Sequence, residues 1–229
     1  MGVTQDLEKL ANPEKAKILQ GFFKTGKGEY GEGDIFLGIT VPQTRKIAKA
    51  NSNLDLDEVE KLLKSKIHEQ RLCALLILVN KYEKGTSTER EKIVNLYLAN
   101  TRLVNNWDLV DLTAPKILGH YLFDKDRSLL YKLAKSKSLW ERRIAIISTF
   151  HYIRNDEFED ALRIAEILLN DRQELIHKAV GWMLREIGKR DLKAEESFLG
   201  KHHKNIPRVT LRYAIERFEP KKKEFYMRK

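Results

Sequence analysis

The chain has a single cysteine, Cys73, and only five prolines in 229 residues. One cysteine cannot form an intramolecular disulfide, so we expect a reducing, cytoplasmic location. No stretch approaches the roughly 18 uninterrupted apolar residues of a membrane-spanning helix, and the polar start does not resemble a secretion signal. The sequence therefore predicts a cytoplasmic protein with no membrane partner.

The sequence also lacks the motifs that are typical of metal sites, nucleotide sites and common catalytic nucleophiles. The six histidines are scattered, and the adjacent pair His202 and His203 lacks a neighbouring cysteine or carboxylate cluster, so we expect no metal and no cofactor. Glycines are concentrated in residues 24–38, where GKGEYG matches G-x-G-x-x-G, but no apolar strand precedes it and a dinucleotide site is excluded. We expect a loop, whose Lys24, Lys27 and backbone N–H groups could contact a phosphate.

Positive charge is in excess. Lys and Arg outnumber Asp and Glu 43 to 33, which gives a net charge of +10. This balance favours a polyanion such as DNA as the partner. A basic, well-solvated surface without such a partner remains the alternative.

Apolar residues recur at helical spacing almost throughout the chain after residue 40, and alternating strand patterns are nearly absent. Five helical segments align on a small residue flanked by apolar ones: Ala74, Ala114, Ala145, Ala179 and Ala214. The spacing is typical of a two-helix repeat, in which the small residue allows close helix packing. We therefore predict an all-α fold of HEAT-like repeats forming a curved solenoid, with an irregular helical bundle as the alternative.

The repeat register also aligns polar residues. Arg143, His177 and Arg212 each lie two positions before the repeated alanine, and Lys178 lies one position before it. These side chains could follow a DNA backbone along successive repeats. A solvated helix face would explain the same charges.

Two tryptophans and a carboxylate are the strongest candidates for chemistry. Trp107 and Asp111 are four residues apart and so share one side of a helix, while Trp182 lies three residues after a repeated alanine. Core packing is the alternative for the tryptophans. For Asp111 the alternatives are helix capping or pairing with a surface lysine.

Four phrases together resemble the DNA alkylation repair family of HEAT-like repeat glycosylases, of the alkylpurine DNA glycosylase D type. They are NPEKAKILQGFFKTGKGEYGEGDIFLGITVPQTRKIAK, NNWDLVDLTAPKILG, SLWERRIAI and IHKAVGWMLREIGKR. The resemblance implies a solenoid that cradles duplex DNA and removes N3- and N7-alkylated purines. It also implies that the lesion can stay stacked in the duplex.

The resemblance implies roles for individual residues. Trp107 and Asp111 correspond to the family's aromatic residue and catalytic carboxylate, Arg143 to a DNA-contacting arginine, and Trp182 to a second aromatic residue at the lesion. Phe22 stands where the family often has tyrosine, which keeps the ring and loses the hydroxyl.

Together these observations predict one domain over residues 1–229, with a basic tail at 219–229 that we expect to be flexible. The predicted activity is hydrolysis of the N-glycosidic bond of N3-methyladenine and N7-methylguanine in duplex DNA, by a monomer without an obligatory protein partner. A noncatalytic repeat module that binds damaged or structured DNA is the first alternative, and a protein-interaction scaffold is the second.

Overall fold

The computed structural model describes residues 2–228, which form helices joined by short turns. Within this range the only β-type pairing is an isolated bridge between Ile35 and Ile67. The all-α prediction is therefore confirmed. None of the helices in this part of the chain is both long enough and apolar enough to cross a lipid bilayer.

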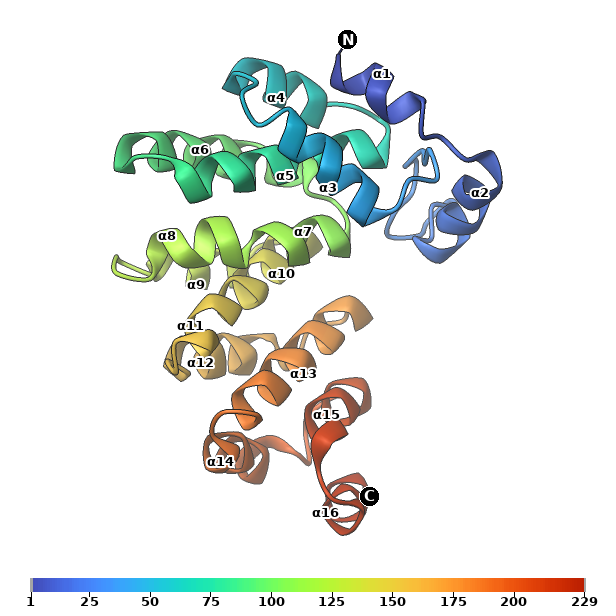
Figure 1. Cartoon of the computed structure of the whole chain (residues 1–229). Helices are drawn as coiled ribbons and strands as arrows, with labels where there is room; N and C mark the ends of the chain where they lie inside the picture. Colours follow the sequence, from blue (N-terminus) through green and yellow to red (C-terminus); the bar gives the residue numbers. More distant parts are fainter. Residues whose placement is uncertain (1, 229) are drawn as a thin grey trace. The chain divides into compact units, whose positions relative to one another are not determined.

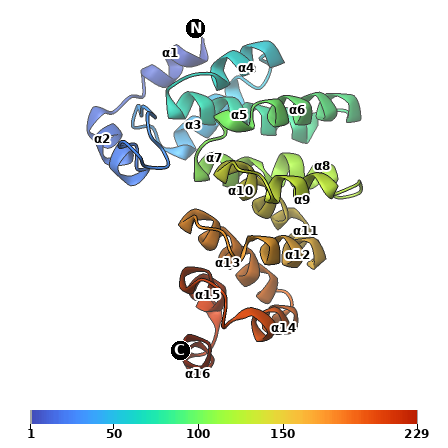
Figure 2. The same ribbon diagram turned by 180° about the vertical axis from the view of Figure 1, so that it is seen from behind.

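The chain divides into two compact units, one ending at Thr113 and the other beginning at Ala114. The helices of the first unit are α1 (Val3–Glu8), α2 (Pro13–Phe22), α3 (Val41–Ala50), α4 (Leu56–Leu63), α5 (His68–Lys84), α6 (Ser87–Ala99), η1 (Thr101–Leu103) and α7 (Trp107–Thr113). Within this unit α2 and α6 lie at opposite ends (Figure 1 and Figure 2).

Helix α5 is the centre of the first unit. It packs against α3, α4, α6 and α7, and every residue from His68 to Val79 is buried. A helix covered on all sides has no solvent face, so its apolar run is nearly continuous. Its first turn is the exception, because the sequence there reads HEQR.

The second unit begins with a π-helical turn, η2 (Pro115–Gly119), and its helices form two rows (Figure 1 and Figure 2). One row contains α9 (Ser128–Ala134), α12 (Glu159–Leu168) and α14 (Leu192–His202). The other contains α10 (Leu139–Ser148), α13 (Glu174–Gly188) and α15 (Arg208–Ala214). The remaining elements are α8 (His120–Leu122), α11 (Phe150–Arg154), η3 (Ile215–Arg217) and α16 (Pro220–Met227).

The five repeated alanines are buried, as expected for small residues that allow close helix packing. All five are fully buried, at 0% exposure: Ala74, Ala114, Ala145, Ala179 and Ala214. In the second unit three of them lie on α10, α13 and α15, which pack in succession. These three alanines are therefore buried on helices that pack against one another.

Side-chain caps set where several helices begin. Asn12 accepts a hydrogen bond from the Lys15 backbone N–H at 3.0 Å, at the start of α2. The Thr86 hydroxyl and the Glu89 carboxylate form a capping box at the start of α6, directly after Gly85. Such caps satisfy backbone N–H groups that have no partner inside the helix.

The C-terminal segment at 219–229, for which we predicted a flexible basic tail, is described as far as residue 228. As far as the structure describes it, it contains α16, and Tyr226 on this helix is buried. Lys222 forms an ion pair with Glu196, and Arg208 donates a hydrogen bond to the Met227 carbonyl at 2.6 Å. Tyr226 also makes edge contacts with the rings of His203 and Phe218.

Candidate functional site

Helix α7 carries the two predicted residues Trp107 and Asp111. Their four-residue spacing places them one turn apart on the same side of the helix, and both are half-buried. Neither is enclosed in the core, unlike Leu109 and Val110 between them, which are fully buried. The helix thus presents an aromatic ring and a carboxylate together.

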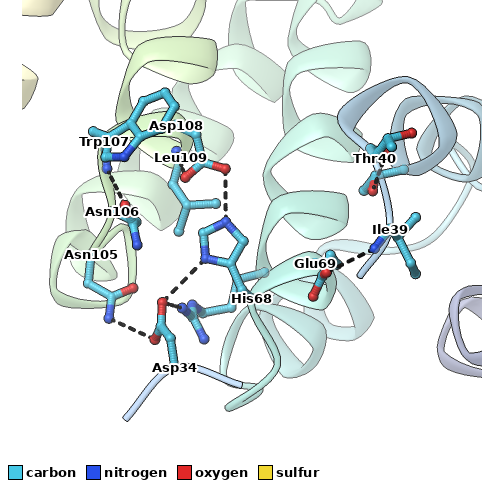
Figure 3. A network of polar contacts seen from close by, with 12 residues as sticks. Asp34, Ile39, Thr40, His68, Glu69, Asn105, Asn106, Trp107, Asp108 and Leu109 are labelled. Carbon is cyan, nitrogen blue, oxygen red and sulfur yellow. Dashed lines mark hydrogen bonds and ion pairs between the residues drawn. The ribbon is translucent and has the colours of Figure 1, made fainter. Parts of the chain in front are cut away.

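The other carboxylate of this motif, Asp108, has a different environment. It is buried, and its Oδ2 lies 2.8 Å from Nε2 of His68, the first residue of α5 (Figure 3). Its Oδ1 accepts the backbone N–H of Leu109 at 2.9 Å. Asp108 is therefore committed to holding the start of α7 against α5.

His68 connects Asp108 to a second buried carboxylate, Asp34, whose Oδ2 lies 3.3 Å from Nδ1 of the ring (Figure 3). Burial opposes protonation, but the charge and hydrogen bond of Asp108, with the bond to Asp34, outweigh it and raise the pKa of His68 to about 9. A ring with a carboxylate at each nitrogen fits the imidazolium form, in which both nitrogens donate.

Asp34 is also buried, which opposes its ionisation. The hydrogen bond from His68 and the charge of Arg71, whose Nη2 lies 2.7 Å from Asp34 Oδ2, nevertheless hold the pKa of Asp34 below its usual value. Asn105 donates to the other carboxylate oxygen at 3.4 Å. The network thus joins the glycine-rich loop, α5 and the segment leading into α7.

Aromatic rings cover the network. Phe36 stacks on His68 with ring centroids 4.5 Å apart, and Phe23 stacks on both Phe36 at 5.0 Å and Trp107 at 5.2 Å. Phe22, which we predicted as a site residue, makes an edge contact with Trp107 at 5.9 Å and is 62% exposed. The structure therefore brings Phe22 and Trp107 together.

The tyrosine hydroxyl that Phe22 lacks is present nearby on another residue. Tyr30, in the glycine-rich loop, donates a hydrogen bond to the Phe22 carbonyl at 3.4 Å. Its ring is half-buried.

The glycine-rich loop is held by carboxylates. Glu29 accepts the backbone N–H of Gly26 at 2.9 Å, and Glu32 accepts that of Gly28 at 2.8 Å. These two N–H groups are already satisfied, and an approaching phosphate would meet the two carboxylates. The phosphate contact that we suggested for these N–H groups is therefore not supported.

The buried Glu69 on α5 fixes the end of the same loop. Its carboxylate accepts three consecutive backbone N–H groups, from Leu37 at 2.9 Å, Gly38 at 2.8 Å and Ile39 at 3.1 Å. Gly38 adopts φ +83, and a side chain there would meet the Asn12 carbonyl at 2.2 Å. Only glycine suits this position.

The remaining predicted residues lie in the second unit. Trp182 on α13 is half-buried, its Nε1 donates to Glu186 at 3.0 Å, and its ring centroid lies 5.6 Å from that of Phe150. Lys178 on the same helix is ion-paired with Glu174 at 2.7 Å.

Arg143, His177 and Arg212 share a repeat phase but not an environment. Arg143 is buried, and its guanidinium donates to the Leu175 carbonyl across α10 and α13. His177 is half-buried with Nε2 at 2.6 Å from the Asp171 carbonyl, whereas Arg212 is exposed. The predicted polar stripe is therefore not uniformly exposed, because the packing of α13 on α10 encloses its first member.

Sequence reasoning missed Asp34, His68, Glu69 and Asp108 as parts of one site. One signal was available, since HEQR directly precedes the apolar run LCALLILV on the same helix, where polar residues must find buried partners. The partners themselves are 30 to 40 residues away in sequence. Periodicity does not reveal contacts over such distances.

A search of curated proteins gave no significant match. Among solved structures the chain is similar to a predicted DNA alkylation repair enzyme from Enterococcus faecalis, with TM-score 0.71 and 17% identity over 92% of this chain and 97% of that one. It is also similar to AlkD2 from Streptococcus mutans, with TM-score 0.56 and 17% identity over 91% and 99% of the two chains.

A third similar structure is smu.31 from Streptococcus mutans UA159, with TM-score 0.52 and 19% identity over 95% of this chain and 98% of that one. These similarities support the predicted helical-repeat fold. The sequence profile described as DNA alkylation repair enzyme matches residues 3–218, nearly the whole chain. The chain therefore belongs to the family of DNA alkylation repair enzymes.

Proposed function

We propose that the protein hydrolyses the N-glycosidic bond of N3- and N7-alkylated purines in duplex DNA, with Asp111 as the catalytic carboxylate. The observation that carries this proposal is the difference between the two acids of α7. Asp108 is buried and held by His68 at 2.8 Å, whereas Asp111 is half-buried beside Trp107. Family membership supports repair of alkylated DNA as the broader function, and the glycosylase reaction is part of the proposal.

Breaking an N-glycosidic bond creates positive charge on the sugar. A carboxylate near the anomeric carbon stabilises this oxocarbenium-like state and orients the attacking water. An N3- or N7-alkylated purine is already cationic and leaves as a neutral base, so no second carboxyl group is needed to protonate it. One carboxylate therefore suffices, and the product is an abasic site in an uncleaved strand.

The aromatic residues favour a cationic substrate. Ring faces attract cations by about 0.5–2 kcal/mol each. Trp107 and Phe22 supply this contact in the first unit, and Trp182 is the proposed counterpart in the second. Arg143, Arg212, Lys178 and His177 are the proposed DNA contacts of the second unit.

The test measures release of free base from duplex DNA containing N7-methylguanine or N3-methyladenine, in the presence of a metal chelator. We expect the parent protein to release base and Asp111→Asn to lose about 10²- to 10³-fold in rate, the usual cost of removing one electrostatic stabiliser. Duplex binding should persist. Asp57→Asn, an exposed acid in the first turn of α4, is the matched control and should release base at the parent rate.

Other outcomes identify the alternatives. Tight, salt-sensitive duplex binding without base release would contradict the proposed enzyme and support a noncatalytic DNA-binding module. Absence of salt-sensitive DNA binding would favour a protein scaffold. Full release by Asp111→Asn would reject Asp111 as the catalytic group while leaving the activity in place.

A further inference from the structure

Helix α16 ends the second unit (Figure 1), and its sequence PKKKEFYM is both basic and aromatic. The helix begins at Pro220, whereas the match to the DNA alkylation repair profile ends at residue 218. None of the residues proposed for catalysis or DNA contact lies on it. Family membership therefore does not explain the role of this helix.

Tyr226 fixes which side of α16 faces the protein. Tyr226 is buried, and Lys222, one turn before it, pairs with Glu196 of α14. Lys221 and Phe225 share the adjacent side because they are four residues apart, and both are exposed. This side of the helix thus presents an ammonium group and a phenyl ring to solvent, one turn from each other.

Phe225 is 60% exposed and is held by neighbouring rings. Its ring centroid lies 5.2 Å from that of Tyr226 and 6.0 Å from that of His203. A single exposed apolar residue needs no explanation by itself. This ring, however, is fixed in position and lies in a segment of unusual charge.

The segment formed by α15, η3 and α16 is strongly cationic. Residues 207–228 contain seven cations and three carboxylates, so they supply four of the ten net positive charges of the chain. Six of these cations are exposed, namely Arg208, Arg212, Arg217, Lys221, Lys222 and Arg228. Such a concentration of positive charge attracts polyanions.

Ion pairs with neighbouring helices leave this balance unchanged, because one adds a carboxylate and the other adds a cation. Lys222 pairs with Glu196 of α14. Glu216 of the segment pairs with Arg185 of α13. The excess of positive charge is therefore not cancelled where the segment packs on the rest of its unit.

The other nearby carboxyl groups do little against the positive charge. Glu224 is paired with Arg228 at 2.8 Å. Glu195 of α14 lies near Tyr226, and burial raises the pKa of its carboxyl to about 8, so it is mainly protonated at pH 7. Glu219, at the start of α16, is the last carboxylate of the segment and is outnumbered by the exposed cations.

Cations beside a fixed aromatic ring fit one class of polyanion best. The phosphates of a nucleic acid are attracted by the cations, and a planar base can stack on Phe225. In a duplex each base face is covered by its neighbours in the stack, so only an unpaired base can offer its face to the ring. An anionic membrane surface would also attract the cations, but one phenyl ring on an eight-residue helix is a small apolar face to insert.

We propose that α16 binds a single strand of nucleic acid, with one base stacked on Phe225 and Lys221 at the backbone. Arg208 of α15 donates a hydrogen bond to the Met227 carbonyl, which extends the cationic face from the end of α16 onto α15. Arg212, the proposed duplex contact, lies one turn further along the same side of α15. The inference goes beyond the proposed base release, because it concerns an additional surface for an unpaired strand.

Fluorescence anisotropy of the full-length protein with a labelled oligodeoxythymidylate, whose bases are unpaired, tests this surface. We expect Phe225→Ala to weaken binding about tenfold, the usual effect of losing one stacked base, and Phe225→Trp to retain it. Lys221→Ala should reduce the slope of log affinity against log salt by about 0.7, the value for one phosphate contact on a single strand. The same variants should bind a long duplex as the parent protein does.

Matched controls separate this surface from a general loss of charge or apolar area. Lys132→Ala removes an exposed cation of α9, and Leu10→Ala removes an exposed apolar side chain of the first unit. Neither should change the affinity for the single strand or its salt slope. Because Phe225 and Lys221 are exposed, their variants should also keep the thermal unfolding and the base-release rate of the parent protein.

Several outcomes would overturn the inference. Equal single-strand binding by the parent, Phe225→Ala and Lys221→Ala would show that α16 is not the binding surface. Equal weakening of single-strand and duplex binding would show that an unpaired base is not recognised. A loss of binding to phosphatidylserine vesicles by Phe225→Ala, with the oligonucleotide still bound, would identify a membrane surface instead.

Two further arms identify the strand and separate this inference from the proposed function. An equal effect of Phe225→Ala on an oligouridylate would support a surface for RNA as well as DNA, and an effect on the oligodeoxythymidylate alone would support one for DNA. The expected losses in a protein that releases no base would keep this surface and reject the glycosylase. Base release by a parent protein whose single-strand binding is unaffected by these substitutions would do the reverse.

Discussion

The two acidic residues of the WDLVD motif have different environments, although they lie only three residues apart on α7. Asp108 faces inward and pairs with His68, while Asp111 lies on the half-buried side with Trp107. A buried ion pair costs desolvation, and it persists here because both nitrogens of the ring have carboxylate partners. The network positions α7, which carries the proposed catalytic groups.

His68 makes stability depend on pH. Its pKa is about 9 in the folded protein and 6.5 in the unfolded chain, so the folded state binds the proton more tightly. The stabilisation is complete below pH 6.5 and is lost as the pH rises through 9. We expect the free energy of unfolding to fall by an amount on the order of 3 kcal/mol across this window.

Urea unfolding at several pH values measures this change. Glu195 is buried, which raises the pKa of its carboxyl to about 8, so it titrates in an overlapping range. The informative quantity is therefore the difference between the parent and His68→Gln. That difference should shrink as the pH approaches 9, and a difference independent of pH would contradict a charged His68.

At the scale of elements, the close packing of helices depends on residues without side chains as well as on the buried alanines. On α13, a Cβ at Gly181 would lie 2.4 Å from the Thr210 carbonyl of α15 and 2.5 Å from Tyr213 Cβ. These neighbours are backbone and the root of a side chain, so they cannot move aside cheaply. Gly181 thus sets how closely the two helices approach.

We expect Gly181→Ala to destabilise the protein by about 2 kcal/mol or more, because overpacking outweighs the gain in helix propensity. Gly200 on α14 is the matched control, since a Cβ there would meet nothing within 4 Å. Gly200→Ala should stabilise by about 0.5–1 kcal/mol. Thermal unfolding of the two variants checks this, and a shift of the same sign in both would contradict the packing argument.

Over the whole molecule, the net charge of +10 predicts binding to DNA that weakens as salt is added. Each phosphate contact contributes about one unit to the slope of log affinity against log salt. Arg212 on α15 is exposed and keeps its proposed role as such a contact.

Arg212→Ala should therefore weaken duplex binding and reduce this slope by about one. Arg163 on α12 is also exposed but pairs with Glu159 at 2.5 Å, and Arg163→Ala serves as the control with an unchanged slope. Fluorescence anisotropy at increasing salt measures both. Equal slopes for the parent and Arg212→Ala would show that Arg212 does not contact DNA phosphates.

The sequence alone determined the features that depend on local periodicity. Helical spacing predicted the all-α fold, the burial of alanines such as Ala145 and Ala179, and the shared side of Trp107 and Asp111. These follow from 3.6 residues per turn and need no knowledge of distant contacts. The four sequence phrases taken together, including the one around Trp107, also sufficed to indicate the family.

Tertiary structure decided what lies opposite each side chain. Asp34, His68 and Asp108 meet across 34 and 40 residues of sequence, and Arg143 is enclosed because α13 packs over it. In the first unit, tertiary packing brings Phe22 against Trp107, with ring centroids 5.9 Å apart. Burial and long-range pairing depend on how helices stack, and that stacking is the sum of many contacts that no local pattern records.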